Sequence, residues 1–328
     1  MQFSRPGSYA EEVAVLRSNV IDLHGTTLSW EELAALPESY LTVWGAVGRS
    51  LGLAKGQTLL VRGATAALGL AATAYAKSLG AKVVATTRSE RNFQRLREVG
   101  ADVAIVDRGR IEEDLRRALP EGVDAALEVV GAATLRDTIK VLKPFGAVAV
   151  VGLLGGPPVL ESLNLMQDLP SATRLNFFPS GMLGTAALPL TDAPLRAIAE
   201  GISAGRIPSL RVRTFDFGDV RQAHALMESD RALGKLVVQL WRQNGLRTAR
   251  FDKWRVRGAT LFRPPCARLS RRVKCAPQEW ISAEGSRRTT RRRENPVRRR
   301  FEPSGRDEWD DARPGAAREY PIDDQPSP

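Results

Sequence analysis

The chain has 328 residues, 43% of them hydrophobic, which is enough apolar surface for one large domain or two ordinary ones. The net charge of +11 is concentrated at one end, because residues 243–328 hold 19 Arg and 2 Lys against 12 acidic residues. The longest apolar stretch, residues 146–156, is much shorter than the roughly 20 residues of a membrane-spanning helix, and residues 1–12 do not read as a secretory signal. We therefore expect no membrane span and a cytoplasmic location.

The sequence offers no pattern of metal ligands. The two cysteines, Cys266 and Cys275, lie in the basic C-terminal stretch, whereas the two histidines, His24 and His224, lie far from them in the chain. Metal sites need several such side chains at characteristic spacings. We therefore predict no metal site.

From residue 58 onward, short runs rich in β-branched residues alternate with helical stretches. The predicted strands are residues 58–62, 82–86, 103–106, 123–129 and 147–152. The predicted helices between them are residues 68–79, 91–99, 112–119 and 134–142. Strands that are apolar almost throughout and separated by helices indicate a parallel sheet covered on both faces. The predicted fold class is α/β, a doubly wound parallel sheet of the Rossmann kind.

The alternation is looser after Gly152. We expect a strand at residues 174–178, a helix at 193–204, a strand at 211–217, a helix with Asp219 as its N-cap, and a last strand at 235–240 after Gly234. Beyond Trp241 no periodicity remains, and the Arg-rich composition predicts disorder.

A glycine turn follows the first of these strands. Residues 63–69 read GATAALG, with Gly63 and Gly69 at the two ends, and they open a helix. A strand, a tight turn and a helix N-terminus form a pyrophosphate site, because free N–H groups and the helix dipole attract negative charge. The loop lacks the middle glycine of GxGxxG, so a plain tight turn with close helix packing is the alternative.

A second signal lies at the end of the next strand, where NAD-binding domains usually place an acidic residue against the ribose hydroxyls. Here Arg88, Ser89 and Arg91 follow the strand. Two guanidinium groups can bind a 2′-phosphate through charge-assisted hydrogen bonds, which favours NADP(H) over NAD(H). The alternative is that Ser89 caps the next helix and both arginines are merely solvated.

Several motifs in order resemble one family. LAALPESYLTVWGAV, KGQTLLVRGATAALGLAA, AKSLGAKVVATTRSERN, GADVAIVD and AHALMESDRALGKLVVQL together are similar to the medium-chain dehydrogenase/reductase family, in particular its zinc-free quinone oxidoreductases. The resemblance extends over residues 7–240. It implies hydride transfer from NADPH to a quinone, an enone or a related carbonyl compound, and a homodimer.

The resemblance also implies positions for the cofactor. It places Thr42 beside the nicotinamide, the pyrophosphate at Ala66, Ala67 and Leu68 after Gly63, and the 2′-phosphate at Arg88, Ser89 and Arg91. Gly131, Gly152 and Leu153 would flank the ribose and the nicotinamide, and Phe178 would close over the ring. Glycines at strand ends are often only turn residues, and Phe178 could equally be an ordinary core aromatic. By the same resemblance, His224 is structural.

The chain departs from the family at both ends. Residues 1–40 resemble the last part of a GroES-like substrate domain, residues 41–210 form the NADP-binding domain, residues 211–242 return to the substrate domain, and residues 243–328 are the basic tail. With most of the substrate domain absent, residues 7–21 and 212–240 are expected to expose apolar surface and unpaired strand edges. The tail is either an out-of-frame extension or a nucleic-acid arm, and its lack of a reading motif argues against nucleic acid.

Two functions remain open from the sequence. The first is an NADPH-dependent oxidoreductase, in which no dedicated acid or base is required and solvent, Tyr40 or Thr42 could protonate the product. We assign no catalytic residue. The alternative is a catalytically impaired NADP(H)-binding module that lacks most of its substrate domain.

Overall fold

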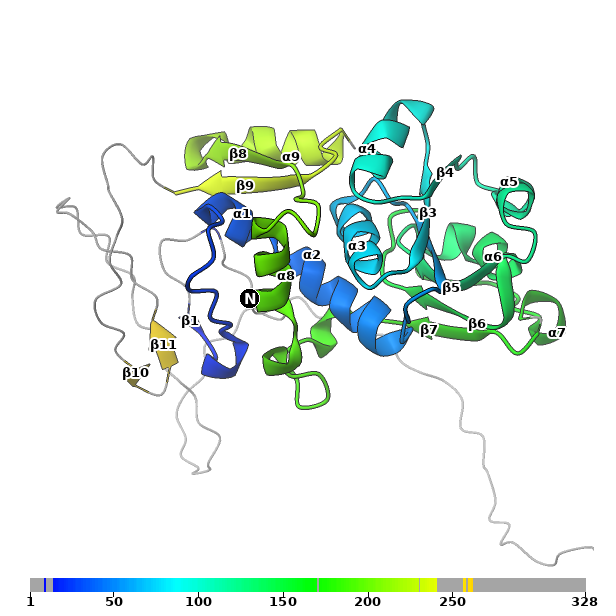
Figure 1. Ribbon diagram of the computed structural model, residues 1–328, viewed down its shortest axis with the longest axis horizontal. Helices are drawn as coiled ribbons and strands as arrows, with labels where there is room; N and C mark the ends of the chain where they lie inside the picture. The colour runs from blue at the N-terminus through cyan, green and yellow to red at the C-terminus, as the bar shows by residue number, and fades with distance from the viewer. Residues whose placement is uncertain are drawn as a thin grey trace, which may run out of the picture. The chain divides into compact units, whose positions relative to one another are not determined.

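The computed structural model describes residue 9 and residues 14–169, 171–229, 231–240, 256–257 and 259–261. Its centre is a six-stranded sheet in the order β4-β3-β2-β5-β6-β7, and every pair of neighbours in this sheet is parallel (Figure 1). The strands are β2 Thr58–Arg62, β3 Lys82–Thr87, β4 Val103–Val106, β5 Val123–Glu128, β6 Leu142–Val150 and β7 Arg174–Phe177. The predicted doubly wound α/β fold is confirmed.

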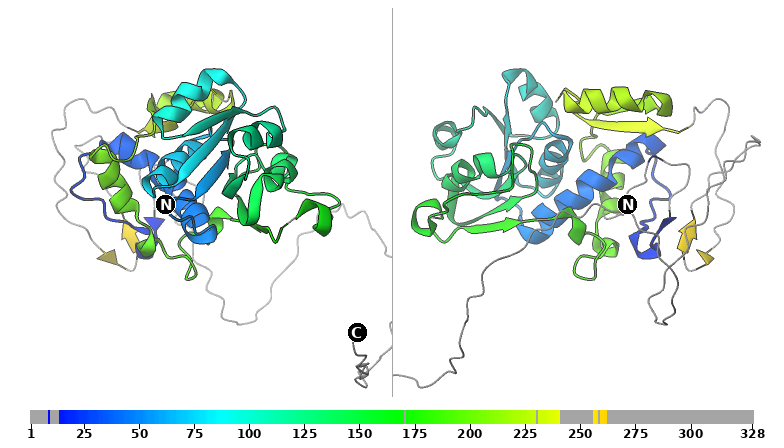
Figure 2. Two further views of the ribbon diagram at one scale, coloured as in Figure 1. Left: turned by 45° about the vertical axis from the view of Figure 1, so that its right-hand side comes forward. Right: turned by 180° about the vertical axis from the view of Figure 1, so that it is seen from behind.

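Helices cover both faces of this sheet (Figure 2). On one face, Leu59 and Val61 of β2 pack in a core cluster with α2 Pro37–Val43, the π-helix η2 Trp44–Ser50 and α3 Ala67–Ser78. On the other face, Leu60 of the same strand packs in a second cluster with α5 Glu112–Ala118 and α6 Ala132–Lys140. Successive side chains of a strand point to opposite faces, so a strand buried on both faces is apolar along most of its length.

The remaining elements lie outside this sheet. They are β1 Ala14–Val15, η1 Arg17–Asn19, α1 Trp30–Ala35, η3 Glu90–Asn92, α4 Phe93–Glu98, α7 Leu165–Asp168, η4 Ser180–Met182, η5 Leu190–Asp192, α8 Leu195–Ser203, β8 Val212–Asp216, η6 Phe217–Asp219, α9 Val220–Glu228, β9 Lys235–Gln239, β10 Val256–Arg257 and β11 Ala259–Leu261. β8 and β9 form a parallel two-stranded sheet, with α9 connecting them. No helix in the described part of the chain is long and apolar enough to cross a membrane.

Three local predictions need correction. The predicted helix at 134–142 ends earlier, at Lys140, because Leu142 already pairs with Val123 as the first residue of β6. Asp219 occupies the N-cap position of α9, but its carboxylate accepts a hydrogen bond from the Gln222 side chain and not from a backbone amide.

The third correction concerns the basic tail, for which no strand was predicted. Residues 256–257 and 259–261 form β10 and β11, and β11 pairs with β1 at the other end of the chain. The rest of the predicted disordered stretch lies outside the described residues. Of the apolar surface expected near the N-terminus, Leu16 and Val20 are indeed exposed.

Candidate functional site

The order of the strands creates a switch point at the centre of the sheet. From β2 the chain proceeds outward through β3 and β4, and from β5 it proceeds the other way through β6 and β7. In sheets of this kind, ligands bind outside the carboxyl ends of the strands where the direction reverses. The residues directly after β2, β3, β5 and β6 all belong to this edge, and they include most of the predicted cofactor residues.

The turn between β2 and α3 has the geometry of an anion cradle. Gly63 has a φ of +80°, and a Cβ at Gly69 would lie 2.6 Å from both the Ala64 Cα and the Gly63 carbonyl oxygen. Ala66 is the extended N-cap residue, and α3 begins at Ala67 without an acidic residue in its first turn. The first N–H groups of a helix have no intrahelical acceptor, so the backbone at Ala67 and Leu68 can receive a negatively charged group. The turn therefore fits a pyrophosphate.

The end of β3 is joined to this turn. The amide of Gly63 donates to Thr86 Oγ1 at 3.1 Å, and the amide of Ala64 donates to the Thr86 carbonyl at 3.0 Å. Arg88 and Arg91 are exposed beyond this point. Ser89 stands at the N-cap position of η3, but its side chain makes no capping hydrogen bond there. Ser89 thus has the position of a helix cap, as the alternative required, but does not make the capping hydrogen bond.

The loops that follow β5 and β6 touch through two glycines. Gly131 has a φ of +109°, and a Cβ there would lie 2.8 Å from the Gly152 carbonyl oxygen. A Cβ at Gly152 would lie 1.9 Å from the Val129 carbonyl oxygen, a separation that no side chain can accommodate. Leu153, next in the chain, is exposed. These glycines are required for the close approach of the two loops, whatever else they contact.

Three predicted residues lie in the interior instead of on the edge. Phe178 is 5% exposed and packs against Gly45 of η2, where a Cβ would lie 2.2 Å from the ring. The Thr42 hydroxyl donates to the Glu38 carbonyl at 2.8 Å within α2. Tyr40 is fully buried, and its hydroxyl has no hydrogen-bond partner among the described residues. Burial raises the pKa of Tyr40, so this phenol stays protonated.

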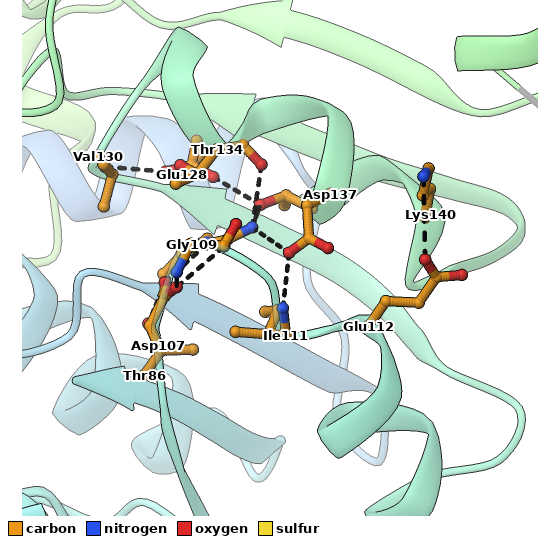
Figure 3. Close-up of polar contacts among 12 residues, drawn as sticks. Thr86, Asp107, Gly109, Ile111, Glu112, Glu128, Val130, Thr134, Asp137 and Lys140 are labelled. Atoms are coloured by element: carbon orange, nitrogen blue, oxygen red, sulfur yellow. Dashed lines mark hydrogen bonds and ion pairs between the residues drawn. The ribbon is translucent and has the colours of Figure 1, made fainter. Parts of the chain in front are cut away.

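Arg62, the last residue of β2, is the centre of a polar cluster at this edge that was not predicted from the sequence. Its side chain is fully buried and pairs with Asp107 through Nε at 2.8 Å and with Asp137 through Nη1 at 2.7 Å. Figure 3 shows Asp107 and Asp137 reaching the same point from different segments of the chain. An arginine inside an otherwise apolar strand was the signal that could have revealed it.

The charges in this cluster are stabilised by one another. Burial acts to lower the pKa of Arg62, but its hydrogen bond to Asp107 and the charges of Asp107, Glu128 and Asp137 raise it above its ordinary value. Burial acts to raise the pKa of Asp107, but the hydrogen bond and charge of Arg62 outweigh it and hold that pKa below its ordinary value. Arg62 and Asp107 are therefore both charged near neutral pH.

Glu128, the last residue of β5, is the other buried acid at this edge. Its carboxylate accepts hydrogen bonds from the amides of Val130 and Gly131, at 2.8 and 3.1 Å, and from the Thr138 hydroxyl at 2.6 Å. Burial raises its pKa, although these hydrogen bonds act in the opposite direction. Glu128 thus shapes the loop that carries Gly131 from inside the protein.

Two cavities lie away from the glycine turn. One, of about 460 Å³, is lined by residues of α1 and β8, including Glu31 and Val212. The other, of about 510 Å³, is lined by Arg110, the start of α5 and one side of α6. In the described residues, no group of three or more His, Cys, Asp or Glu side chains is arranged to hold a metal ion.

Comparisons with known proteins agree with this geometry. Residues 67–183 match the family model for zinc-binding dehydrogenases. The chain is 29% identical to the mitochondrial NAD(P)H oxidoreductase RTN4IP1 of Mus musculus over 244 residues, which are 70% of this chain and 60% of the relative. It is 27% identical over 216 residues to quinone oxidoreductase-like protein 2 of Bos taurus, covering 65% of this chain and 61% of that one. The chain thus spans about 60% of the length of these two relatives.

Solved structures give the same answer for the fold. The crystal structure of an NAD-dependent alcohol dehydrogenase superposes with a TM-score of 0.62 at 26% identity, covering 72% of this chain and 66% of that one. The sequence matches, the strand order and the glycine turn all indicate a dinucleotide-binding fold of the dehydrogenase kind. Over the matched residues, the chain is therefore similar to oxidoreductases of the medium-chain dehydrogenase/reductase family, among them a quinone oxidoreductase-like protein.

Proposed function

We propose that this protein is an NADPH-dependent oxidoreductase that transfers hydride to a quinone, an enone or a related carbonyl compound. The observation that carries the proposal is the glycine turn at the N-terminus of α3, with Arg88 directly after β3 where an NAD-binding domain would place an acid. NADPH would supply the hydride, and the chain would supply binding and orientation.

The pyrophosphate, the 2′-phosphate, the ribose and the nicotinamide of the cofactor each have proposed contacts. The pyrophosphate would lie at the backbone of Ala66, Ala67 and Leu68, above Gly63. Arg88 and Arg91 would bind the 2′-phosphate, with Ser89 as an additional donor. The remaining assignments, for the ribose and the nicotinamide, are Thr42, Gly131, Gly152, Leu153 and Phe178. Since Thr42 and Phe178 are buried, they would form the protein side of the nicotinamide pocket and would not be exposed at its surface.

The preference for the 2′-phosphate rests on charge. The names of the relatives do not select one cofactor, because one reads NAD(P)H and another NAD-dependent. A guanidinium at the end of β3 attracts a phosphate dianion, whereas a carboxylate there would repel it. We also propose that the protein acts as a homodimer, which light scattering of the full chain measures directly.

The first experiment is a fluorescence titration of the full chain with NADPH and with NADH, repeated for the variant Arg88→Ala/Arg91→Ala. Because a hydrogen bond to a charged group contributes about 1.5–3 kcal/mol, we expect NADPH to bind the variant at least about tenfold more weakly, with little change for NADH. Arg117→Ala, on the exposed side of α5, is the control and should bind like the parent protein.

If the parent protein is folded and binds neither nucleotide, the proposal is wrong. NADPH binding without turnover on a panel of quinones and enones would favour the alternative, a catalytically impaired NADP(H)-binding module. NADPH consumption with one of these acceptors would establish the oxidoreductase.

A further inference from the structure

The buried Arg62 cluster holds together the ends of β2 and β3 and the segment that follows β4, where the adenosine half of the proposed cofactor would bind. All three nitrogens of the guanidinium donate hydrogen bonds. Nε and Nη2 donate to the two carboxylate oxygens of Asp107, and Nη1 donates to Asp137. Nη2 also donates to the Gly109 carbonyl at 3.2 Å. Nη1 also donates to the Thr134 carbonyl and to Thr138 Oγ1, each at 2.9 Å. A fully buried arginine with this many partners fixes every segment that it touches.

The segment most affected is the loop of residues 107–111, between β4 and α5. The amide of Gly109 donates to Asp107 Oδ1 at 2.8 Å, and the amide of Ile111 donates to Asp137 Oδ2 at 2.9 Å. The two carboxylates that hold Arg62 therefore also hold the middle and the far end of this loop, as Figure 3 shows for Gly109 and Ile111. Without the guanidinium, Asp107 and Asp137 would repel each other and release the loop.

This loop starts beside the proposed 2′-phosphate position. In the register of β3 and β4, Thr87 pairs with Val106, so Arg88 and Asp107 are the next residues of neighbouring strands. Arg108 follows immediately and is exposed. With the pyrophosphate at the turn after β2, the adenosine half of a dinucleotide would lie over β3 and β4. The loop thus brings a third arginine to the side of the sheet that carries Arg88 and Arg91.

The cluster also reaches the glycine turn itself. Thr86 Oγ1 accepts the amide of Gly63 and lies 3.5 Å from Asp107 Oδ2. One buried cation therefore connects the turn for the pyrophosphate with the loop beyond β4.

We propose that Arg62 is a positioning residue that holds the 107–111 loop so that Arg108 joins Arg88 and Arg91 around the 2′-phosphate of NADPH. This inference rests on the proposed function. Arg62 itself does not contact the cofactor, because its side chain is fully buried and saturated by protein partners. Arg110, two residues further on, lines the cavity beside α5 and α6 and is assigned no part in phosphate binding.

The test compares NADPH and NADH binding in four variants of the full chain. Arg62→Lys keeps the positive charge, but a single ammonium cannot bind both oxygens of Asp107 and also reach Asp137. We expect Arg62→Lys and Arg108→Ala each to weaken NADPH binding about tenfold, with NADH binding changed less than about twofold. Arg110→Ala controls for loss of a loop arginine, and Arg117→Lys, which has two ion pairs on exposed α5, controls for the Arg-to-Lys change.

Hydrogen exchange at the amides of Gly109 and Ile111 measures the loop independently of any nucleotide. Faster exchange in Arg62→Lys together with a selective loss of NADPH affinity supports the inference. Equal weakening of NADPH and NADH would show a merely structural role and overturn it, as would unchanged NADPH affinity in Arg108→Ala. If Arg62→Lys does not fold, Asp137→Asn serves for the same comparison. A parent protein without NADPH preference would overturn the proposed function first, and this inference with it.

Discussion

At the scale of single residues, the closest backbone approaches in the candidate site occur at glycines that no other residue can replace. Gly152 stands where a Cβ would meet the carbonyl oxygen of Val129 at 1.9 Å. Relief would require moving β5 or β6, and both are buried in the middle of the sheet. The strand-end glycines of the sequence are therefore structural requirements in their own right, and any contact with a cofactor is additional.

We predict that Gly152→Ala destabilises the fold by about 1–3 kcal/mol or more, because overpacking a close backbone contact forces the neighbouring segments apart. Gly181→Ala is the matched control, since a Cβ at Gly181 would have no atom within 4 Å. Urea denaturation of the two variants and the parent protein measures the difference. Equal stability of the two alanine variants would contradict the contact described here.

At the scale of elements, strands with continuous apolar character were the easiest to predict. Strand β2 was predicted at residues 58–62 and is found at Thr58–Arg62, because each of its side chains is buried on one face or the other. Strand β6 was predicted to start at residue 147 but starts at Leu142. Lys143, Pro144 and an exposed Phe145 interrupt its apolar pattern, and the register with β5 shifts there. A strand that bulges outward does not show its period in the sequence.

Phe145 illustrates the strain within that bulge. It has a φ of +62° and is 75% exposed, so its side chain contributes little burial while its backbone occupies the left-handed region. Asn and Asp tolerate this region better than most other residues with a side chain. We predict that Phe145→Asn stabilises the protein by up to about 1 kcal/mol.

The control for this prediction is Phe177→Asn, at an exposed phenylalanine of β7 whose φ is not positive. It should be neutral or destabilising, because Asn is disfavoured in strands. A thermal melt of both variants separates the two cases. A loss of stability in Phe145→Asn would show that the ring, and not the backbone, determines the energy at this position.

The candidate site was predictable where it depends on local sequence. The glycine turn and Arg88 follow directly from their places after β2 and β3. The Arg62 cluster was not predictable, because its partners Asp107 and Asp137 are 45 and 75 residues away and meet it only once β4 and α6 are in place. Neither could the sequence show that Phe178 packs against Gly45. Such contacts depend on tertiary structure and leave no periodic signal.

At the scale of the whole molecule, stability should depend on pH through the same cluster. The folded pKa of Asp107 is lowered, whereas its unfolded value is about 3.9. The ion pair with Arg62 therefore stabilises the fold above that pH, and the stabilisation is lost as the pH falls through the folded pKa. Glu128 has a raised pKa and acts with the opposite sign, so only a substitution isolates the contribution of Asp107.

We predict that Asp107→Asn is less stable than the parent protein by about 1–3 kcal/mol at pH 7, and that the difference narrows below about pH 4. Urea denaturation at several pH values between 7 and 3 measures it. Asp114→Asn, which removes an exposed partner of Arg117, should follow the parent curve throughout. Parallel curves for Asp107→Asn and the parent protein would mean that the carboxylate is not held charged by Arg62.

The cellular compartment is a property of the whole molecule. The cytoplasmic location predicted from the sequence stays a prediction, because the relative in Mus musculus is named as mitochondrial. Fractionation of cells that produce the full chain would decide between the two.

The burial of Arg62 has a consequence for how the protein folds. Its guanidinium is at the end of β2. One carboxylate partner, Asp107, directly follows β4 in one half of the sheet, and the other, Asp137, belongs to α6, which connects β5 and β6 in the other half. A chain in which only one of these segments had docked would leave part of a buried charge without its partner, which is costly in a poorly solvated interior. The cluster therefore penalises half-assembled sheets. The two halves of the sheet, β4-β3-β2 and β5-β6-β7, should form in a single cooperative step, and neither should persist without the other.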